Sequence, residues 1–210
     1  MERKIEMKEE NNLPRRVSTT RMLTESALLV AVATVLSLFA VFRLQNGGSV
    51  TIGSMIPIVL ISLKYRFGWA LLTALAYSLI QMITGFFAPP VENLLYYTLM
   101  ILLDYVLAFS VLCLAGPIYR VLNVKLPDRV RMMTGAIICF VLRFFCHFFS
   151  GIIIWGTYAP KGQPVWLYSL LYNGSYMLLE CLISGVVIFV AGQMLASVFI
   201  GEKRKAKESS

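Results

Sequence analysis

The sequence predicts an all-α integral membrane protein with six transmembrane helices and both termini in the cytoplasm. Of its 210 residues, 58% are hydrophobic and only 14% are charged, whereas soluble domains carry roughly 25% charged residues. The apolar residues form runs close to the roughly 17–25 residues that a helix needs to cross a bilayer. Because the basic residues lie between these runs and at both chain ends, the net charge of +8 does not indicate nucleic-acid binding.

Six apolar runs are candidate membrane spans, and the second is the weakest. At a rise of about 1.5 Å per residue it would reach only about 21 Å, against a hydrocarbon core of about 30 Å, and Pro57 interrupts it. Length alone therefore permits five spans as well as six. The six candidates are residues 22–42, 50–63, 68–87, 93–114, 132–155 and 167–200.

The distribution of Lys and Arg favours six spans. With six, nearly all of the 19 basic residues fall on one side of the membrane, only Arg43 and Lys161 fall on the other, and Arg143 lies within a span. Cytoplasmic loops are enriched in Lys and Arg, so we expect that side to be the cytoplasm. The predicted parts are a basic cytoplasmic tail over residues 1–21, a six-helix membrane domain over 22–200, and a second basic cytoplasmic tail over 201–210.

The cysteines and short motifs give no sign of a metal site or of an enzyme. Cys113, Cys139, Cys146 and Cys181 lie inside apolar runs without the paired spacing of a metal site. The chain has no GxxxxGK[ST] nucleotide-binding loop and neither HExxH nor GxSxG. We therefore expect no cofactor and no enzymatic activity, and any ATP hydrolysis would depend on a partner protein.

Four ionisable side chains lie well inside the predicted spans: Asp104, Arg143, His147 and Glu180. Such groups are costly in a bilayer and usually face a bundle interior or a cavity. The structural alternative is mutual neutralisation, with Arg143 paired to Asp104 or Glu180. Glu25 lies close enough to the cytoplasmic end of the first span to reach the membrane interface.

The predicted fifth helix carries polar and aromatic residues at a regular interval. Arg143, His147, Gly151 and Trp155 recur every four residues, which places them on one slowly drifting stripe of a helix. Gly151 is expected to leave room for a flat ligand between the aromatic faces of His147 and Trp155.

Further polar groups follow beyond the outer loop, where Tyr168 and Asn173 add a hydroxyl and an amide near the same leaflet. Taken singly, Tyr168, Trp155 and Trp166 also fit the aromatic belt of a membrane interface. Together with Asp104 and the stripe, they predict a pocket lined by aromatic rings, an anion, a cation and an amide. Such a pocket suits a small, flat, partly charged heterocycle.

The segment 143–173 resembles the substrate-binding region of the thiamine-specific S-components of energy-coupling-factor vitamin transporters. The block H-x3-G-x3-W, followed by Y-S-L and N-G, carries most of the resemblance; LLDYVLAF, NGGSVTIGSMIPI and LTESALLVAVATVLS extend it over nearly the whole chain between the charged tails. It implies a six-helix subunit of a bacterial plasma membrane that binds thiamine near its extracellular face. It also implies three partner proteins, namely a transmembrane coupling subunit and two cytoplasmic ATPases.

The resemblance further implies roles for individual residues. Trp155 and His147 would stack on or flank the thiamine rings, Asp104 would face the cationic thiazolium ring, and Tyr168 and Asn173 would hydrogen-bond the ligand. The residues implied to line the site are Asp104, Tyr105, Arg143, His147, Gly151, Trp155, Tyr168 and Asn173.

Two features depart from other members of that family. Some members have Lys at the position of Arg143, and a guanidinium presents a planar fork rather than a point charge. Some place a Trp and a Glu in the first outer loop, where this chain has Asn46-Gly47-Gly48-Ser49. On the first helix, Ala27 and Ala31 form a small-x3-small pair, and in the family the matching pair faces the coupling subunit.

Two other functions remain as alternatives. The first is an S-component for a different vitamin, such as riboflavin or a biotin-like acid, although Asp104 beside stacking aromatics favours a cationic ligand. The second is a self-sufficient secondary transporter, which would predict internal repeat symmetry. The sequence shows no such repeat.

Overall fold

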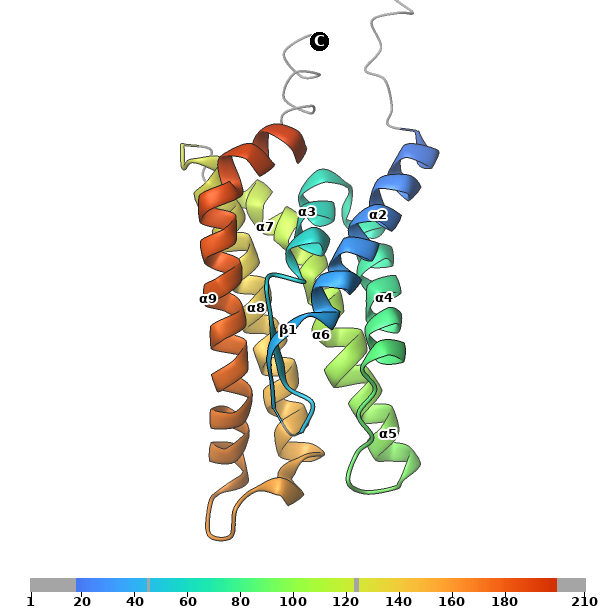
Figure 1. Ribbon diagram of the computed structural model, residues 1–210, viewed down its shortest axis with the longest axis vertical. Helices are drawn as coiled ribbons and strands as arrows, with labels where there is room; N and C mark the ends of the chain where they lie inside the picture. Colours follow the sequence, from blue (N-terminus) through green and yellow to red (C-terminus); the bar gives the residue numbers. More distant parts are fainter. Residues whose placement is uncertain (1–17, 45, 123–124, 200–210) are drawn as a thin grey trace, which may run out of the picture.

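The computed structural model describes residues 18–44, 46–122 and 125–199. Figure 1 shows an elongated bundle of helical segments that run along its long axis, with a small β-hairpin among them. The described ends of the first and last helices, Thr19 and Phe199, lie at one end of the bundle, here named the terminal end (top of Figure 1). The tip of the β-hairpin points to the opposite end, here named the hairpin end.

Among the described residues, five helices are long and apolar enough to cross a membrane, and a shorter sixth segment, α3, lies among them (Figure 1). The chain is therefore a helical integral membrane protein with six helical segments, as the sequence predicts. The long helices are α2 (Thr19–Leu38), α4 (Phe67–Thr84), the composite helix α5 to α7 (Leu94–Val121), α8 (Asp128–Ile153) and α9 (Val165–Phe199).

The composite helix changes its winding several times along its length. Its first turn is capped by Asn93, whose side chain accepts a hydrogen bond from the backbone N–H of Leu95 at 2.9 Å. A π-helical turn, which is wider than an α-helical one and frequently occurs at functional sites, follows and carries Asp104. The successive pieces are α5 (Leu94–Met100), π-helix η1 (Ile101–Leu107), α6 (Ala108–Ser110), 3-10 helix η2 (Val111–Leu114) and α7 (Ala115–Val121).

The second predicted span differs most from its prediction. Residues 50–63 do not form one helix: β1 (Ala40–Arg43) and β2 (Ser49–Thr51) form an antiparallel hairpin, and α3 (Ile56–Lys64) follows. Pro57 does not interrupt α3 but lies in its first turn, where a missing N–H breaks no helical hydrogen bond. All nine residues of α3 are buried, including Ser62 and Lys64, so the rest of the bundle surrounds this short helix.

Other boundaries differ by a few residues. The helix α2 begins at Thr19, after an N-cap at Ser18, and ends at Leu38 because the chain turns into β1. The helix α8 ends at Ile153, so Trp155 lies beyond it. The predicted residue Ile200, the tail 201–210 and most of the tail 1–21 lie outside the described residues.

Polar contacts join α2 to α3 near the terminal end. The Glu25 carboxylate pairs with Arg21 and with Lys64, each at 2.8 Å, and it accepts a hydrogen bond from the Tyr65 hydroxyl. The sequence indicated only that Glu25 could reach the membrane interface, whereas the structure shows it in contact with three side chains. It holds the first membrane helix against the buried one.

We expect the hairpin end to face the outside of the cell. A cysteine introduced by Lys161→Cys, in the exposed connection between α8 and α9, should react in intact cells with a maleimide that does not cross membranes. Arg66→Cys, also exposed but in the connection between α3 and α4 at the terminal end, should react only after permeabilisation. The reverse pattern of labelling would contradict the predicted orientation.

Candidate ligand-binding site

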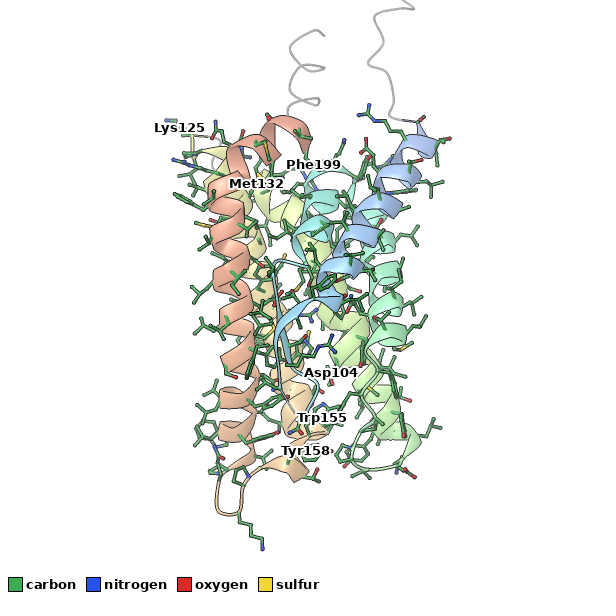
Figure 2. All side chains as sticks on the ribbon, viewed as in Figure 1. Asp104, Lys125, Met132, Trp155, Tyr158 and Phe199 are labelled. Atoms are coloured by element: carbon green, nitrogen blue, oxygen red, sulfur yellow. The ribbon has the colours of Figure 1, made fainter. Side chains whose placement is uncertain are left out.

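A cavity of about 430 Å³ lies between the β-hairpin, η1, α8 and α9. Figure 2 shows Asp104 and Trp155 projecting toward the same region in the hairpin half of the bundle. Segments far apart in the sequence thus converge on one space. All eight residues predicted to form a site line it: Asp104, Tyr105, Arg143, His147, Gly151, Trp155, Tyr168 and Asn173.

The Asp104 carboxylate is held by three side chains that follow one another on α8 and the turn after it. Its Oδ1 lies 2.9 Å from Nδ1 of His147. Its Oδ2 accepts hydrogen bonds from the Ser150 hydroxyl at 2.6 Å and from Nε1 of Trp155 at 3.0 Å. Hydrogen bonds to an ionised carboxylate are among the strong ones in proteins, so these contacts fix the position of the charge in the cavity.

His147 leaves one ring nitrogen available in this arrangement. An ionised carboxylate only accepts hydrogen bonds, so Nδ1 carries the proton that points to Asp104. The other nitrogen, Nε2, is buried and has no hydrogen-bond partner among the described residues. In a neutral imidazole this nitrogen is an acceptor, and a buried acceptor without a partner costs free energy. A ligand with an N–H donor would remove that cost.

Arg143 forms no direct ion pair with Asp104 or Glu180. Its guanidinium lies over the Phe109 ring, 3.9 Å from the ring centroid, and Nη1 donates to the carbonyl oxygen of Ala108 at 3.4 Å. Within the described part of the chain no carboxylate lies within 4.0 Å of it. Glu180 instead accepts from the backbone N–H and the hydroxyl of Thr51, at 2.6 and 2.5 Å, and ties the hairpin to α9.

Trp155 reaches the cavity from a turn and not from the helix on which it was predicted. The helix α8 ends at Ile153, and the 3-10 helix η3 (Gly156–Tyr158) begins directly after Trp155. Its ring centroid lies 5.5 Å from that of Phe87 and 6.2 Å from that of Tyr158, with which it is nearly parallel. The indole is thus oriented by aromatic neighbours as well as by Asp104.

Gly151 serves helix packing rather than the ligand gap predicted for it. A Cβ at this position would lie 2.1 Å from Oγ of Ser169 and 2.8 Å from Nδ2 of Asn173. Both atoms belong to α9, so the space beside Gly151 is already filled by the neighbouring helix. The glycine lines the cavity, and it allows α8 and α9 to approach closely.

The polar atoms of Asn173 are largely occupied within the protein. Its Nδ2 donates to the carbonyl oxygens of His147 and Ser169, each at 3.1 Å, and its Oδ1 accepts from the Tyr176 hydroxyl at 2.9 Å. The residue therefore cross-links α8 to α9 behind His147.

Two tyrosines hold loops at the cavity. The Tyr168 hydroxyl accepts from the side chain of Asn46 at 3.1 Å, which fastens the hairpin. The Tyr105 hydroxyl donates to the carbonyl oxygen of Gly85 at 2.9 Å and accepts from the N–H of Phe87 at 3.2 Å. These contacts position the hairpin and the segment after α4 around the cavity.

The glycine-rich tip of the hairpin closes against α9. The N–H of Gly48 donates to the Tyr172 hydroxyl at 3.1 Å, and a Cβ at Gly48 would lie 2.8 Å from Cδ1 of Tyr176. Gly47 has φ of +91°, a conformation that other residues rarely adopt. The loop thus contributes backbone to the cavity wall, and its glycines let it approach the tyrosines.

Comparison with known proteins identifies the group to which this fold and cavity belong. A family model described as Thiamine transporter protein (Thia_YuaJ) matches residues 23–200. The chain belongs to the thiamine transporter family. The thiamine transporter ThiT of Bacillus subtilis (strain 168) is 34% identical over 176 residues, which cover 79% of this chain and 87% of that protein.

Two further members of the thiamine transporter family are similar over different shares of the chain. The thiamine transporter ThiT of Lacticaseibacillus paracasei is 32% identical over 111 residues, covering 50% of this chain and 55% of its own length. A solved structure of ThiT from Listeria monocytogenes has a TM-score of 0.66 and 27% identity, and covers 85% of this chain and 96% of that one. The relatives are named as transporters, and the family function is non-enzymatic.

Sequence reasoning missed several residues at the cavity of this thiamine transporter family member. Tyr172 and Tyr176 line it, and together with Tyr168 they recur every fourth residue, which puts all three on one face of α9. That spacing was a usable signal. Ser150 was also missed, because a single serine in an apolar helix has no distinctive pattern.

Side chains of α9 already occupy the space beside Gly151, so the methyl group of Gly151→Ala would overpack the contact between α8 and α9. We expect this variant to be less stable by about 1–3 kcal/mol and to have a lower melting temperature than the unmodified protein. The matched control is Gly185→Ala on α9, where a Cβ would meet nothing within 4 Å. It should leave the melting temperature unchanged or raise it slightly, because alanine favours a helix more than glycine does. Equal melting temperatures for both variants would show that the packing around Gly151 is loose.

Proposed function

We propose that this chain binds thiamine in the cavity around Asp104. The observation that carries the proposal is a carboxylate inside an apolar bundle that has no Lys or Arg partner within 4.0 Å in the described part of the chain, beside the indole of Trp155. The carboxylate is only 15% exposed, and three side chains already hydrogen-bond it. A ligand cation would add the balancing charge that no described Lys or Arg supplies within 4.0 Å. The thiazolium ring of thiamine supplies a flat cation that suits both the carboxylate and an aromatic face.

The size and remaining polar groups of the cavity also suit thiamine. A volume of about 430 Å³ lies within the range of roughly 300–1,000 Å³ typical of small-molecule sites. The aminopyrimidine ring of thiamine carries an exocyclic amine. An N–H of this amine can donate a hydrogen bond to Nε2 of a neutral His147, which is an acceptor without a partner among the described residues. An acidic ligand, such as a biotin-like vitamin, would instead bring a carboxylate close to Asp104, and like charges repel.

We further propose that the chain is the S-component of an energy-coupling-factor transporter in a bacterial plasma membrane. It would capture thiamine at the extracellular hairpin end and deliver it through a transmembrane coupling subunit and two cytoplasmic ATPases. The sequence has no nucleotide-binding loop of its own, which supports a separate energy source. Ala27 and Ala31 lie exposed on α2, as a docking surface for another membrane helix would require.

Replacing Asp104 by Asn tests the cation site. Thiamine should bind at least about 30-fold more weakly, corresponding to about 2 kcal/mol for a desolvated cation interaction. An analogue whose thiazolium is replaced by an uncharged ring should lose much less affinity. Titration calorimetry of both ligands measures this, with Asp128→Asn near the terminal end as the matched control, which should bind both ligands normally. Equal losses for the two ligands on Asp104→Asn would show that Asp104 only supports packing.

Replacing Ala27 and Ala31 by Trp tests the docking surface. Cellular thiamine uptake should be lost, because the bulky rings prevent the close approach of a partner helix, while the isolated subunit should still bind thiamine. Val190→Trp, at an exposed position on α9, is the matched control and should preserve both uptake and binding. Normal uptake by the α2 variant would contradict the docking role, whereas loss of binding together with uptake would indicate misfolding.

A further inference from the structure

We infer that Ser150 is a positioning residue that holds the Asp104 carboxylate and the Trp155 indole in one arrangement suited to a cationic ring. This inference rests on the proposed binding of thiamine and adds to that proposal a residue that does not itself need to touch the ligand. It starts from a closed triangle of polar contacts between the three side chains.

The three sides of the triangle are short. The Ser150 hydroxyl donates to Oδ2 of Asp104 at 2.6 Å, the shortest contact of that carboxylate. Nε1 of Trp155 lies 3.1 Å from the Ser150 hydroxyl and 3.0 Å from the same Oδ2. Because the hydroxyl both donates and accepts, it links the anion to the aromatic ring directly.

Ser150 also controls Trp155 through the backbone. Its carbonyl oxygen accepts from the N–H of Ile154 at 2.8 Å and from the N–H of Trp155 at 3.4 Å, at the point where α8 ends. The turn that carries the indole into the cavity is thus anchored on the same residue as the indole nitrogen. Trp155 is held at two places by one neighbour.

The Ser150 hydroxyl forms no hydrogen bond to the backbone of a neighbouring helix in the described part of the chain. Its hydrogen bonds in the described part of the chain are both to side chains that line the cavity. Ser169 is equally buried, with an exposed fraction of 0% for both residues, yet its hydroxyl donates to the backbone of Phe148 and joins α9 to α8. The contrast indicates that the Ser150 hydroxyl acts on side chains of the binding site, and through Asp104 it also links α8 to η1.

Loss of this hydroxyl would loosen the two groups that meet the cation. Oδ2 of Asp104 would lose its shortest contact, and the indole N–H would keep only one of its two acceptors. Both side chains would then pay a larger ordering cost when a ligand binds, because rigid groups bind more tightly than mobile ones. A ligand without a positive charge depends less on this arrangement.

The test is Ser150→Ala in the full-length purified protein, titrated with thiamine and with the uncharged-ring analogue. Thiamine should bind about tenfold more weakly or worse, as expected when a hydrogen bond to a charged group is removed, and the neutral analogue should be affected less. In the Asp104→Asn background the same change should cause little further loss, because contacting residues couple non-additively. Ser184→Ala, also fully buried and without a hydrogen-bond partner among the described residues, is the control and should bind thiamine normally.

Unchanged thiamine affinity in folded Ser150→Ala, or losses that simply add in the double variant, would overturn the role of Ser150 and leave the proposed function intact. Absence of thiamine binding to the unmodified protein would instead overturn the proposed function itself. If Ser150→Ala does not fold, Ser150→Cys, which keeps a side chain of similar shape but only a weak donor, should still weaken thiamine binding more than binding of the neutral analogue. If folded Ser150→Cys bound each ligand with the same affinity as the unmodified protein, the role of Ser150 would likewise be overturned.

Discussion

A carboxylate inside an apolar helix bundle needs hydrogen bonds or a cation, and the arrangement of the cavity follows from that need at Asp104. The π-helical turn η1 carries Asp104, and α8 and the turn after it supply the three donors that hold it. The same contacts orient the ring of Trp155 and leave Nε2 of His147 as a buried acceptor. One negative charge therefore organises the aromatic, donor and acceptor groups of the site.

The second helical segment is short and occupies one half of the bundle (Figure 1). The helix α3 fills the interior near the terminal end, whereas the chain before it runs through the hairpin half as β1 and β2 (Figure 1). The cavity lies in this half, between the hairpin and the long helices. Glu180 fastens the junction between hairpin and α3 through Thr51, so the lining of the cavity is tied to the longest helix, α9.

Composition, apolar runs and charge distribution were sufficient to predict the membrane class and the six helical segments. They were insufficient for residues 50–63, because an apolar run looks the same whether lipid or other helices surround it, and the nine residues of α3 are enclosed by protein. Arg143, His147, Gly151 and Trp155, which the four-residue spacing singled out, all line the cavity. The spacing did not show that Gly151 lies against Ser169 and Asn173, because contacts between helices depend on tertiary packing that no local pattern records.

The central claim is that thiamine binds with its thiazolium ring against Asp104, and a structure of the protein determined with thiamine tests it most directly. The thiazolium sulfur can be located by its anomalous scattering at long wavelength, independently of how the rings are fitted. We predict that this sulfur lies in the cavity beside Asp104 and Trp155, with the pyrimidine amine toward Nε2 of His147. Thiamine located outside the cavity, or turned so that the thiazolium ring lies away from Asp104, would contradict the claim.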